Sequence, residues 1–159
     1  MSEATIGLGS NLGDRIANLR AALSLIEQSG PEVIRRSSVW ESAPVPPDQP
    51  AFLNAAAVLN TDHTPETLLD LLKEVEVTLG RRPGRRWGPR PVDLDVLFFD
   101  GLVVEGQQLR IPHPLIGERA FVLAPLLEVM NGDSERFHWA LERLKGVGTA
   151  GINRTGLVL

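Results

Sequence analysis

Several features common in other protein classes are missing from this sequence, and each absence excludes a type of site or location. No cysteine occurs among the 159 residues, which excludes disulfide bonds and thiolate metal sites. No apolar run is long enough to cross a bilayer, and residues 1–4 lack the basic flank and apolar stretch of a signal peptide. We therefore expect a cytoplasmic protein that has no membrane partner.

Composition indicates one globular domain of moderate size. Hydrophobic residues make up 43% and charged residues 23% of the chain, values typical of globular proteins. The length suits a single compact domain, 1–159, in which we expect residues 134–159 to form a peripheral C-terminal helix and tail. The net charge of −4 argues against general nucleic-acid binding, because any basic cluster is then a local patch on an acidic protein.

The most informative stretch is an alternating segment that predicts a β-strand. Its apolar face carries Val92, Leu94, Val96 and Phe98. Asp93 and Asp95 share the opposite face, which becomes apolar again at Leu97 and Phe99. Same-face neighbours on a strand lie about 6.5 to 7 Å apart, so the two carboxylates can bind one hard cation jointly or two cations side by side.

The segment before this strand is cationic and rich in glycine. Its arginines are Arg81, Arg82, Arg85, Arg86 and Arg90. Gly84, Trp87 and Gly88 lie between them. Taken alone, Asp93 and Asp95 would be interpreted as solvent-facing residues of an edge strand. A cationic loop beside two carboxylates instead favours a polyphosphate site, where magnesium and guanidinium groups neutralise the phosphate oxygens.

The segment Arg86-Trp87-Gly88-Pro89-Arg90, followed by Asp93-Leu94-Asp95, resembles the signature of the 6-hydroxymethyl-7,8-dihydropterin pyrophosphokinase family. The resemblance extends over nearly the whole chain to about Leu127. It implies transfer of pyrophosphate from ATP to the hydroxymethyl group of the dihydropterin, with release of AMP, in folate biosynthesis. It also implies ATP as co-substrate and two Mg²⁺ ions as cofactors.

The same resemblance implies roles for individual residues. The implied catalytic residues are Asp93, Asp95, Arg81 and Arg90, and the two aspartates are also the implied ligands of Mg²⁺. The implied pterin-binding residues are Ser42, Ala43, Pro44, Val45, Phe52, Asn54 and Phe121. The implied ATP-binding residues are Glu76, Arg81, Trp87, Arg90, His113 and Arg119. Within the pterin set, the two phenylalanine rings would enclose the heterocycle while the asparagine binds its edge.

Several of these residues have a structural alternative. Asn54 could bond only to backbone, and Phe121 could be a core residue of its helix. Trp87 could anchor the loop, and His113, which lies between two prolines, could cap a turn. The general base stays unassigned, with Asp95 or a metal-bound water as the candidates.

One position in the arginine-rich loop departs from the family pattern. Many relatives carry a second arginine two residues after the one that matches Arg81, whereas this chain has Pro83. We expect Arg82 or Arg85 to supply the missing contact, with Arg85 favoured because Gly84 frees its backbone. The alternative is that both arginines are solvated surface charges.

Periodicity and turn residues predict the order of the elements. The expected strands are 5–9, 32–41, 52–59, 92–99, 102–104 and 109–111. The expected helices are 14–29, 64–79, 119–130 and 134–145, the second with Thr64 as N-cap and Pro65 in its first turn. A hairpin turn is expected at Asp100-Gly101. This order predicts an α+β, ferredoxin-like sandwich with a mainly antiparallel sheet covered by helices.

Two rival functions fit parts of the sequence. An RNA-binding domain could use the arginines and Trp87, but it would give no role to Asp93 and Asp95, which repel phosphates in the absence of metal. A regulatory domain could bind a heterocycle without any need for magnesium. The pyrophosphokinase interpretation gives a role to the arginines, to Trp87 and to both aspartates, so we favour it. We expect ATP and the pterin as partners, no nucleic acid, and a monomeric protein.

Overall fold

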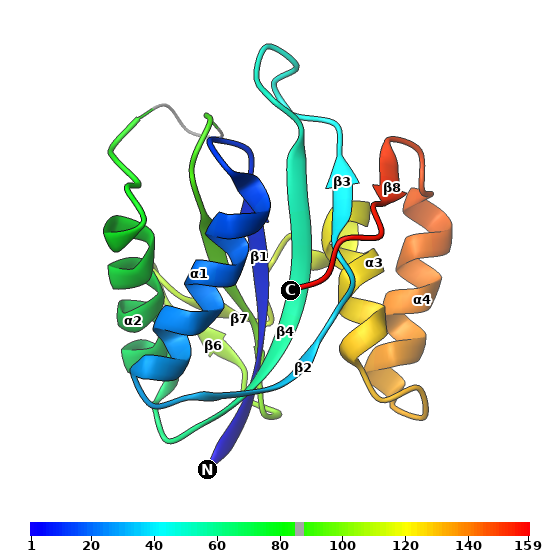
Figure 1. Cartoon of the computed structure of the whole chain (residues 1–159). Helices are drawn as coiled ribbons and strands as arrows, with labels where there is room; N and C mark the ends of the chain where they lie inside the picture. Colours follow the sequence, from blue (N-terminus) through cyan, green and yellow to red (C-terminus); the bar gives the residue numbers. More distant parts are fainter. Residues whose placement is uncertain (85–87) are drawn as a thin grey trace.

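The computed structural model describes residues 1–84 and 88–159 (Figure 1). Its strands are β1 (Ser2–Ser10), β2 (Glu32–Arg36), β3 (Trp40–Ser42), β4 (Phe52–Thr61), β5 (Asp93–Phe99), β6 (Val104–Glu105), β7 (Arg110–Ile111) and β8 (Ile152–Arg154). Its helices are α1 (Arg15–Gln28), α2 (Pro65–Thr78), the short 3-10 helix η1 (Ile116–Glu118), α3 (Ala120–Val129) and α4 (Glu135–Val147).

The described strands form one main antiparallel sheet with helices on both faces. Its order is β5-β1-β4-β3-β8, and β2 pairs with the other half of β4. Strand β1 lies between β5 and β4, in register with β4 from Ser2↔Thr61 to Ser10↔Leu53. Helices α1 and α2 cover one face, and α3 and α4 cover the other (Figure 1). The chain is therefore an α+β protein with a mainly antiparallel sheet, as the sequence predicts.

Two hydrophobic clusters hold these layers together. The larger cluster joins the sheet to α1 and α2 through buried residues such as Ile6, Leu23 and Leu72. The smaller cluster joins the opposite face to α3 and α4 through Leu97 and Leu126. Burial of large aliphatic side chains on both faces stabilises the sheet by about 1.5 to 3 kcal/mol for each side chain. This two-sided packing makes the sheet a rigid support for side chains at its ends.

The start of α2 confirms a specific sequence prediction. The Thr64 hydroxyl accepts a hydrogen bond from Thr67 N at 3.2 Å, and the Thr67 hydroxyl accepts one from Thr64 N at 2.9 Å. Pro65 occupies the first helical position, where its missing N–H costs nothing. The reciprocal cap satisfies backbone donors that the helix itself leaves free.

The segment expected as one strand over 32–41 forms two strands instead. Between β2 and β3, the Ser37 hydroxyl accepts a hydrogen bond from Ala56 N at 2.8 Å, and Ser37 N donates to Ala56 O at 2.9 Å. The pairing of β2 with β4 also shifts register between Val33 and Arg35. These local contacts replace the regular ladder. The prediction of one continuous strand over 32–41 was therefore wrong.

The predicted alternation of faces along β5 holds as far as Val96 and is wrong beyond it. The pairing of β1 with β5 shifts register between Thr5 and Ile6, which pair with Phe98 and Val96 respectively. Residue 97 is thereby the extra residue of a bulge, and Phe98 packs with the α3 and α4 layer while Phe99 packs with the α1 and α2 layer. The bulge follows Asp95, so both aspartates keep their common face.

A turn forms at Asp100-Gly101, but the hairpin expected there does not, because β5 pairs with β1 and the residues after the turn do not extend the main sheet. Asp100 adopts a φ of 47°, and Leu102 N donates to Phe99 O at 3.0 Å. Strand β6 then pairs with β7, where Val104 faces Ile111. None of the helices in residues 1–84 and 88–159 has the length and apolar character needed to cross a membrane.

Candidate active site

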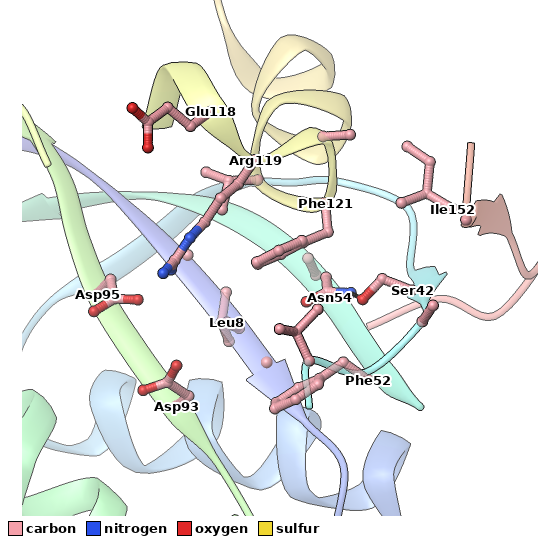
Figure 2. A pocket seen from close by; sticks show the side chains of 18 of the residues that line it. Leu8, Ser42, Phe52, Asn54, Asp93, Asp95, Glu118, Arg119, Phe121 and Ile152 are labelled. Atoms are coloured by element: carbon pink, nitrogen blue, oxygen red, sulfur yellow. Dashed lines mark hydrogen bonds between the residues drawn. The ribbon is translucent and has the colours of Figure 1, made fainter. Parts of the chain in front are cut away.

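One pocket of about 490 Å³ opens on the face of the sheet that α3 covers (Figure 2). Residues from β1, β4 and β5, the loop after β3, the start of α3 and the segment 150–152 line it. The lining includes Ser42, Ala43, Val45, Phe52, Asn54, Arg90, Asp93, Asp95, Arg119 and Phe121. The structure thus brings together most of the residues that the sequence analysis assigned to two ligands.

The apolar end of the pocket has two aromatic rings and one polar pair. Phe52 extends from the start of β4 and Phe121 from the first turn of α3, on either side of Asn54 and Ser42 in Figure 2. Asn54 Nδ2 donates a hydrogen bond to Ser42 Oγ at 2.7 Å, and Asn54 is only 5% exposed. The bond fixes the asparagine amide, so its carbonyl oxygen can accept from a ligand with a planar, hydrogen-bonding edge.

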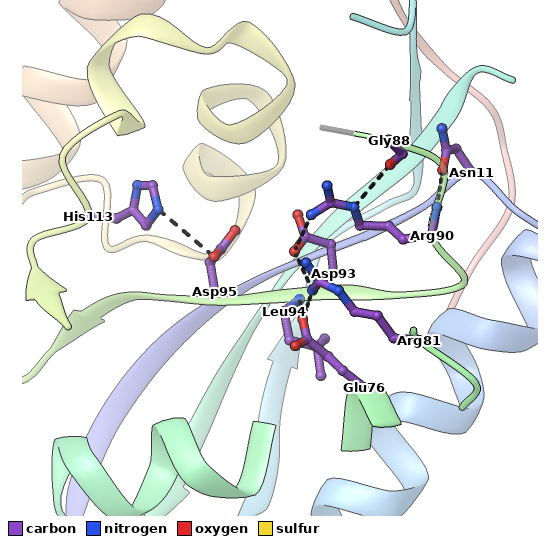
Figure 3. Close-up of polar contacts among 9 residues, drawn as sticks. All are labelled: Asn11, Glu76, Arg81, Gly88, Arg90, Asp93, Leu94, Asp95 and His113. Atoms are coloured by element: carbon purple, nitrogen blue, oxygen red, sulfur yellow. Dashed lines mark hydrogen bonds and ion pairs between the residues drawn. The ribbon is translucent and has the colours of Figure 1, made fainter. Parts of the chain in front are cut away.

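The opposite end of the pocket is charged (Figure 3). Asp93 Oδ1 lies 3.1 Å from Arg81 Nη1 and 3.4 Å from Arg90 Nη1. Asp95 Oδ1 lies 3.9 Å from His113 Nε2. The guanidinium group of Arg119 lies 5.6 Å from the centre of the Phe121 ring, so it reaches from the aromatic end toward the carboxylates (Figure 2).

The environment of Asp95 is unfavourable for a negative charge. Its pKa is raised to about 7, first by burial and then by the nearby carboxylates of Asp93 and Glu76. Arg119 and Arg81 oppose this rise but do not cancel it. The side chain is still 40% exposed, and that exposed part faces the pocket. A cation arriving in the pocket would relieve the repulsion between the carboxylates.

Glu76 and Arg81 hold the start of β5, the strand that carries Asp93 and Asp95. Glu76 Oε2 accepts a hydrogen bond from Leu94 N at 2.9 Å and pairs with Arg81 Nη1, which also contacts Asp93. Burial raises the pKa of Glu76, although these two partners act against the rise. Neither side chain lines the pocket. Their contacts hold Asp93 and β5 in place, and the contact with ATP that the family resemblance implies for both residues stays a prediction.

His113 combines a turn contact with a place beside the carboxylates. Its Nδ1 accepts a hydrogen bond from Leu115 N at 3.2 Å, which assigns the ring proton of the neutral form to Nε2, on the side of Asp95. Burial lowers the pKa of His113, and the charge of Arg119 lowers it further. The neutral imidazole is therefore a hydrogen-bond donor beside Asp95, although His113 itself is not among the residues that line the pocket.

Asn11 is a buried polar residue that the sequence analysis left without a role. Its Oδ1 accepts from Arg90 N at 2.9 Å, while its Nδ2 donates to Gln49 Oε1 at 2.9 Å and to Pro50 O at 3.1 Å. Asn11 is 1% exposed. It therefore ties the end of the arginine-rich loop to the proline-rich loop. The Gly9-Ser10-Asn11 run between a strand and a helix was the available signal.

Some expected site residues lie elsewhere or cannot be placed. Pro44 is not among the residues that line the pocket, although its neighbours on both sides are. Trp87 and Arg85 lie outside the described residues, and with them the expectation that Arg85 replaces the arginine absent at Pro83. Arg82 is described and exposed. The segment 150–152 lines the pocket, although sequence analysis assigned it no role.

Comparison with known proteins places the chain in a family. Residues 5–131 match the family model described as 7,8-dihydro-6-hydroxymethylpterin-pyrophosphokinase. The 2-amino-4-hydroxy-6-hydroxymethyldihydropteridine pyrophosphokinase of Methylorubrum extorquens is 41% identical, over 97% of this chain and 99% of its own length. The protein of the same name from Bacillus subtilis is 46% identical, over 79% of this chain and 77% of its own length.

Longer relatives contain a region like this chain as one part. The chain is 43% identical to the mitochondrial folate synthesis bifunctional protein of Arabidopsis thaliana, over 96% of this chain but only 31% of that protein. Among solved structures, wild-type HPPK-DHPS of Plasmodium falciparum has a TM-score of 0.69 at 16% identity, over 96% of this chain and 44% of that one. This likeness shows a shared fold. From the family-model match and the near full-length relative, the chain belongs to the 7,8-dihydro-6-hydroxymethylpterin-pyrophosphokinase family.

Proposed function

We propose that this protein transfers pyrophosphate from ATP to the hydroxymethyl group of 6-hydroxymethyl-7,8-dihydropterin and releases AMP, a step of folate biosynthesis. The observation that carries the proposal is a single pocket with an aromatic slot at one end and paired carboxylates with arginines at the other. Family membership supports the same activity. The strand order β5-β1-β4-β2 also supports the ferredoxin-like description of the fold.

The pterin occupies the apolar end. Phe52 and Phe121 stack on its two faces, an arrangement that contributes about 1 kcal/mol beyond the burial of area. Asn54, held by Ser42, accepts from the amino edge of the ring through its free carbonyl oxygen. Ala43 and Val45 line the same end of the pocket, and Pro44 between them remains a pterin-binding candidate on the family resemblance alone.

The triphosphate occupies the charged end. Arg90 and Arg119 line the pocket and offer guanidinium groups to the phosphate oxygens. Arg81 reaches Asp93 from outside the lining, and His113 donates from Nε2. Trp87 and Glu76 remain ATP-binding candidates on the family resemblance alone. We assign the positions nearest the reacting phosphorus to Arg90 and Arg119, because charge gathers on the transferred group and on the α-phosphate that leaves.

Asp93 and Asp95 suit magnesium. Within residues 1–84 and 88–159 no group of three or more acidic or histidine ligands gathers around one point. Magnesium in phosphate sites is commonly held by one or two carboxylates together with substrate phosphates and water, so two aspartates on one strand face are sufficient. Two bound Mg²⁺ ions would neutralise the triphosphate and hold the attacking oxygen and the β-phosphorus in line.

The two ends of the pocket have separate roles in the transfer. The stacked rings fix the pterin so that its primary hydroxyl faces the charged end of the pocket. Attack at the β-phosphorus forms the new oxygen–phosphorus bond and breaks the bond to the α-phosphate oxygen, so both outer phosphates leave ATP together. Closing of the pocket against water favours the pterin hydroxyl over hydrolysis.

Product analysis tests the proposed function. Incubation with ATP, Mg²⁺ and the hydroxymethyl-dihydropterin should yield AMP and pterin diphosphate in equal amounts, and AMP should not form when the pterin is left out. Asp95→Asn should abolish this conversion, whereas Asp133→Asn, which changes an exposed carboxylate between α3 and α4, should leave it intact. Pterin-dependent release of ADP would contradict the proposal.

A further inference from the structure

Strand β8 extends the main sheet beside β3, the strand that ends at Ser42. It pairs antiparallel with β3, so that Ile152 faces Ser42 and Arg154 faces Trp40. Gly151 O also accepts a hydrogen bond from Ala43 N at 3.0 Å. The residues of β8 lie beyond residue 131, where the match to the family model ends. The pairing places a segment from the end of the chain directly beside the aromatic end of the pocket.

Ile152 lines that end of the pocket. Residues directly opposite each other in an antiparallel pair project to the same face of the sheet, so Ile152 and Ser42 share the face that α3 covers. Figure 2 shows Ile152 beyond Ser42, on the side of Phe121 away from the aspartates. The isoleucine is 9% exposed and lines the same pocket as Phe121. It therefore gives the slot an apolar edge.

One carboxylate holds β8 against both β3 and α3. Glu128 lies on α3, the helix that also carries Phe121, and its Oε2 accepts from Trp40 Nε1 at 2.7 Å. Its Oε1 lies 3.1 Å from Arg154 Nη2 on β8 and accepts from Ser38 N at 3.2 Å. The three segments that meet at this carboxylate therefore keep a fixed position relative to each other.

A further bond closes the same cluster. Arg154 Nε donates to the Ser38 hydroxyl at 2.8 Å, and that hydroxyl also bonds Glu128. Loss of Arg154 would remove the side-chain link from β8 to Glu128 and leave the backbone ladder to β3 and the bonds from Thr155 to Val39 O. The contribution of the Arg154 side chain to the position of Ile152 can thus be tested separately from the fold of the domain.

We propose that Ile152 is a specificity residue that contacts the edge of the bound heterocycle, and that Arg154 is a positioning residue that holds it there through Glu128. The inference rests on the proposed function, since it names a further residue for the pterin end of the same pocket. An apolar edge at this place selects a flat ring of limited width and disfavours polar groups that project toward β8.

The test compares Ile152→Ala with Asn153→Ala, a change on the same strand at an exposed residue whose side chain projects to the other face. We expect Ile152→Ala to raise the KM for the pterin about tenfold, as removal of methyl groups from an apolar contact does. The KM for ATP should stay close to wild type, and the melting temperature should fall by a few degrees, because Ile152 is also a buried aliphatic side chain. The Asn153→Ala variant should match wild type in all of these values.

Arg154 is tested by rescue. Arg154→Ala should raise the KM for the pterin with little change in kcat, and Arg154→Lys should recover part of the loss because it restores a charge beside Glu128. An unchanged pterin KM in Ile152→Ala would overturn the inference. Equal losses of pterin and ATP binding with a lower melting temperature would also overturn it, by showing a structural role only. A wild-type protein that forms no AMP with the pterin overturns the proposed function, and the inference falls with it.

Discussion

Replacing Asp95 with asparagine should stabilise the metal-free protein while abolishing its activity. The substitution keeps the shape of the side chain and removes its charge from a site where burial and two neighbouring carboxylates oppose ionisation. In the fold the pKa of Asp95 is about 7, compared with its ordinary value of 3.8. The folded protein thus binds an extra proton between these two values, and wild-type stability falls as the pH rises through that window.

The size of the gain follows from the two pKa values. Their difference corresponds to at most about 4 kcal/mol. Because the Asp95 side chain is 40% exposed, screening by water in the pocket reduces the expected gain to about 1 to 2 kcal/mol. For a domain of this size each kilocalorie raises the melting temperature by about 2 to 4 °C. Asp95→Asn should therefore melt a few degrees above wild type at pH 8.

Thermal melting with a chelator present measures this effect. The gain should be largest at pH 8, shrink as the pH falls from about 7, and disappear only below 3.8, where Asp95 is protonated in the unfolded chain as well as in the fold. Asp93→Asn is the matched control, because Asp93 pairs with Arg81 and Arg90, and loss of those pairs should not stabilise the protein. An Asp95→Asn protein that melts at or below the wild-type temperature at pH 8 would refute the reasoning, as would a gain that does not depend on pH.

Further predictions concern other parts of the site. Phe52→Ala and Phe121→Ala should each weaken pterin binding by about 1 to 3 kcal/mol in titration calorimetry and change ATP binding much less, because stacking acts on the heterocycle; equal losses would indicate general damage. Asn11→Ala should destabilise the protein by about 1 to 3 kcal/mol in denaturant unfolding, since it leaves the buried partners of the amide unpaired; an unchanged midpoint would contradict this. Arg143 Nε donates to Gly117 O at 2.9 Å, so Arg143→Ala should loosen η1 and raise the KM for ATP severalfold in steady-state kinetics. Lys145→Ala, which removes an exposed cation from the same helix, is the control.

The acidic strand shows how far local pattern predicts this site. Alternation alone placed Asp93 and Asp95 on one face, because a period of two is a property of any extended strand. The bulge that turns Phe98 toward α3 depends on the register between β5 and β1, which no local pattern contains. Local sequence thus predicted the positions of the carboxylates, and pairing with β1 determined which layer the following residues enter.

Roles that depend on distant partners were the ones that sequence analysis could not assign. The family resemblance implies that Glu76 lies near ATP, which stays a prediction, whereas its bonds to Leu94 N and Arg81, which support the strand, are visible only in the structure. Strand β8 has only three residues, of which Asn153 and Arg154 are polar and exposed, so it has no hydrophobic pattern of its own. Its place in the sheet depends on β3 and on the carboxylate of Glu128, which lies 26 residues from Arg154 in the sequence.

The most direct test of the central claim follows the phosphorus atoms of ATP during one reaction. Phosphorus NMR of a mixture of protein, ATP, Mg²⁺ and hydroxymethyl-dihydropterin should show two coupled resonances from a diphosphate ester on the pterin. A single resonance from AMP should grow at the same rate. This account predicts that both outer phosphates of ATP move together, as expected for attack at the β-phosphorus. A pterin product with one phosphorus, accompanied by the paired resonances of ADP, would contradict it.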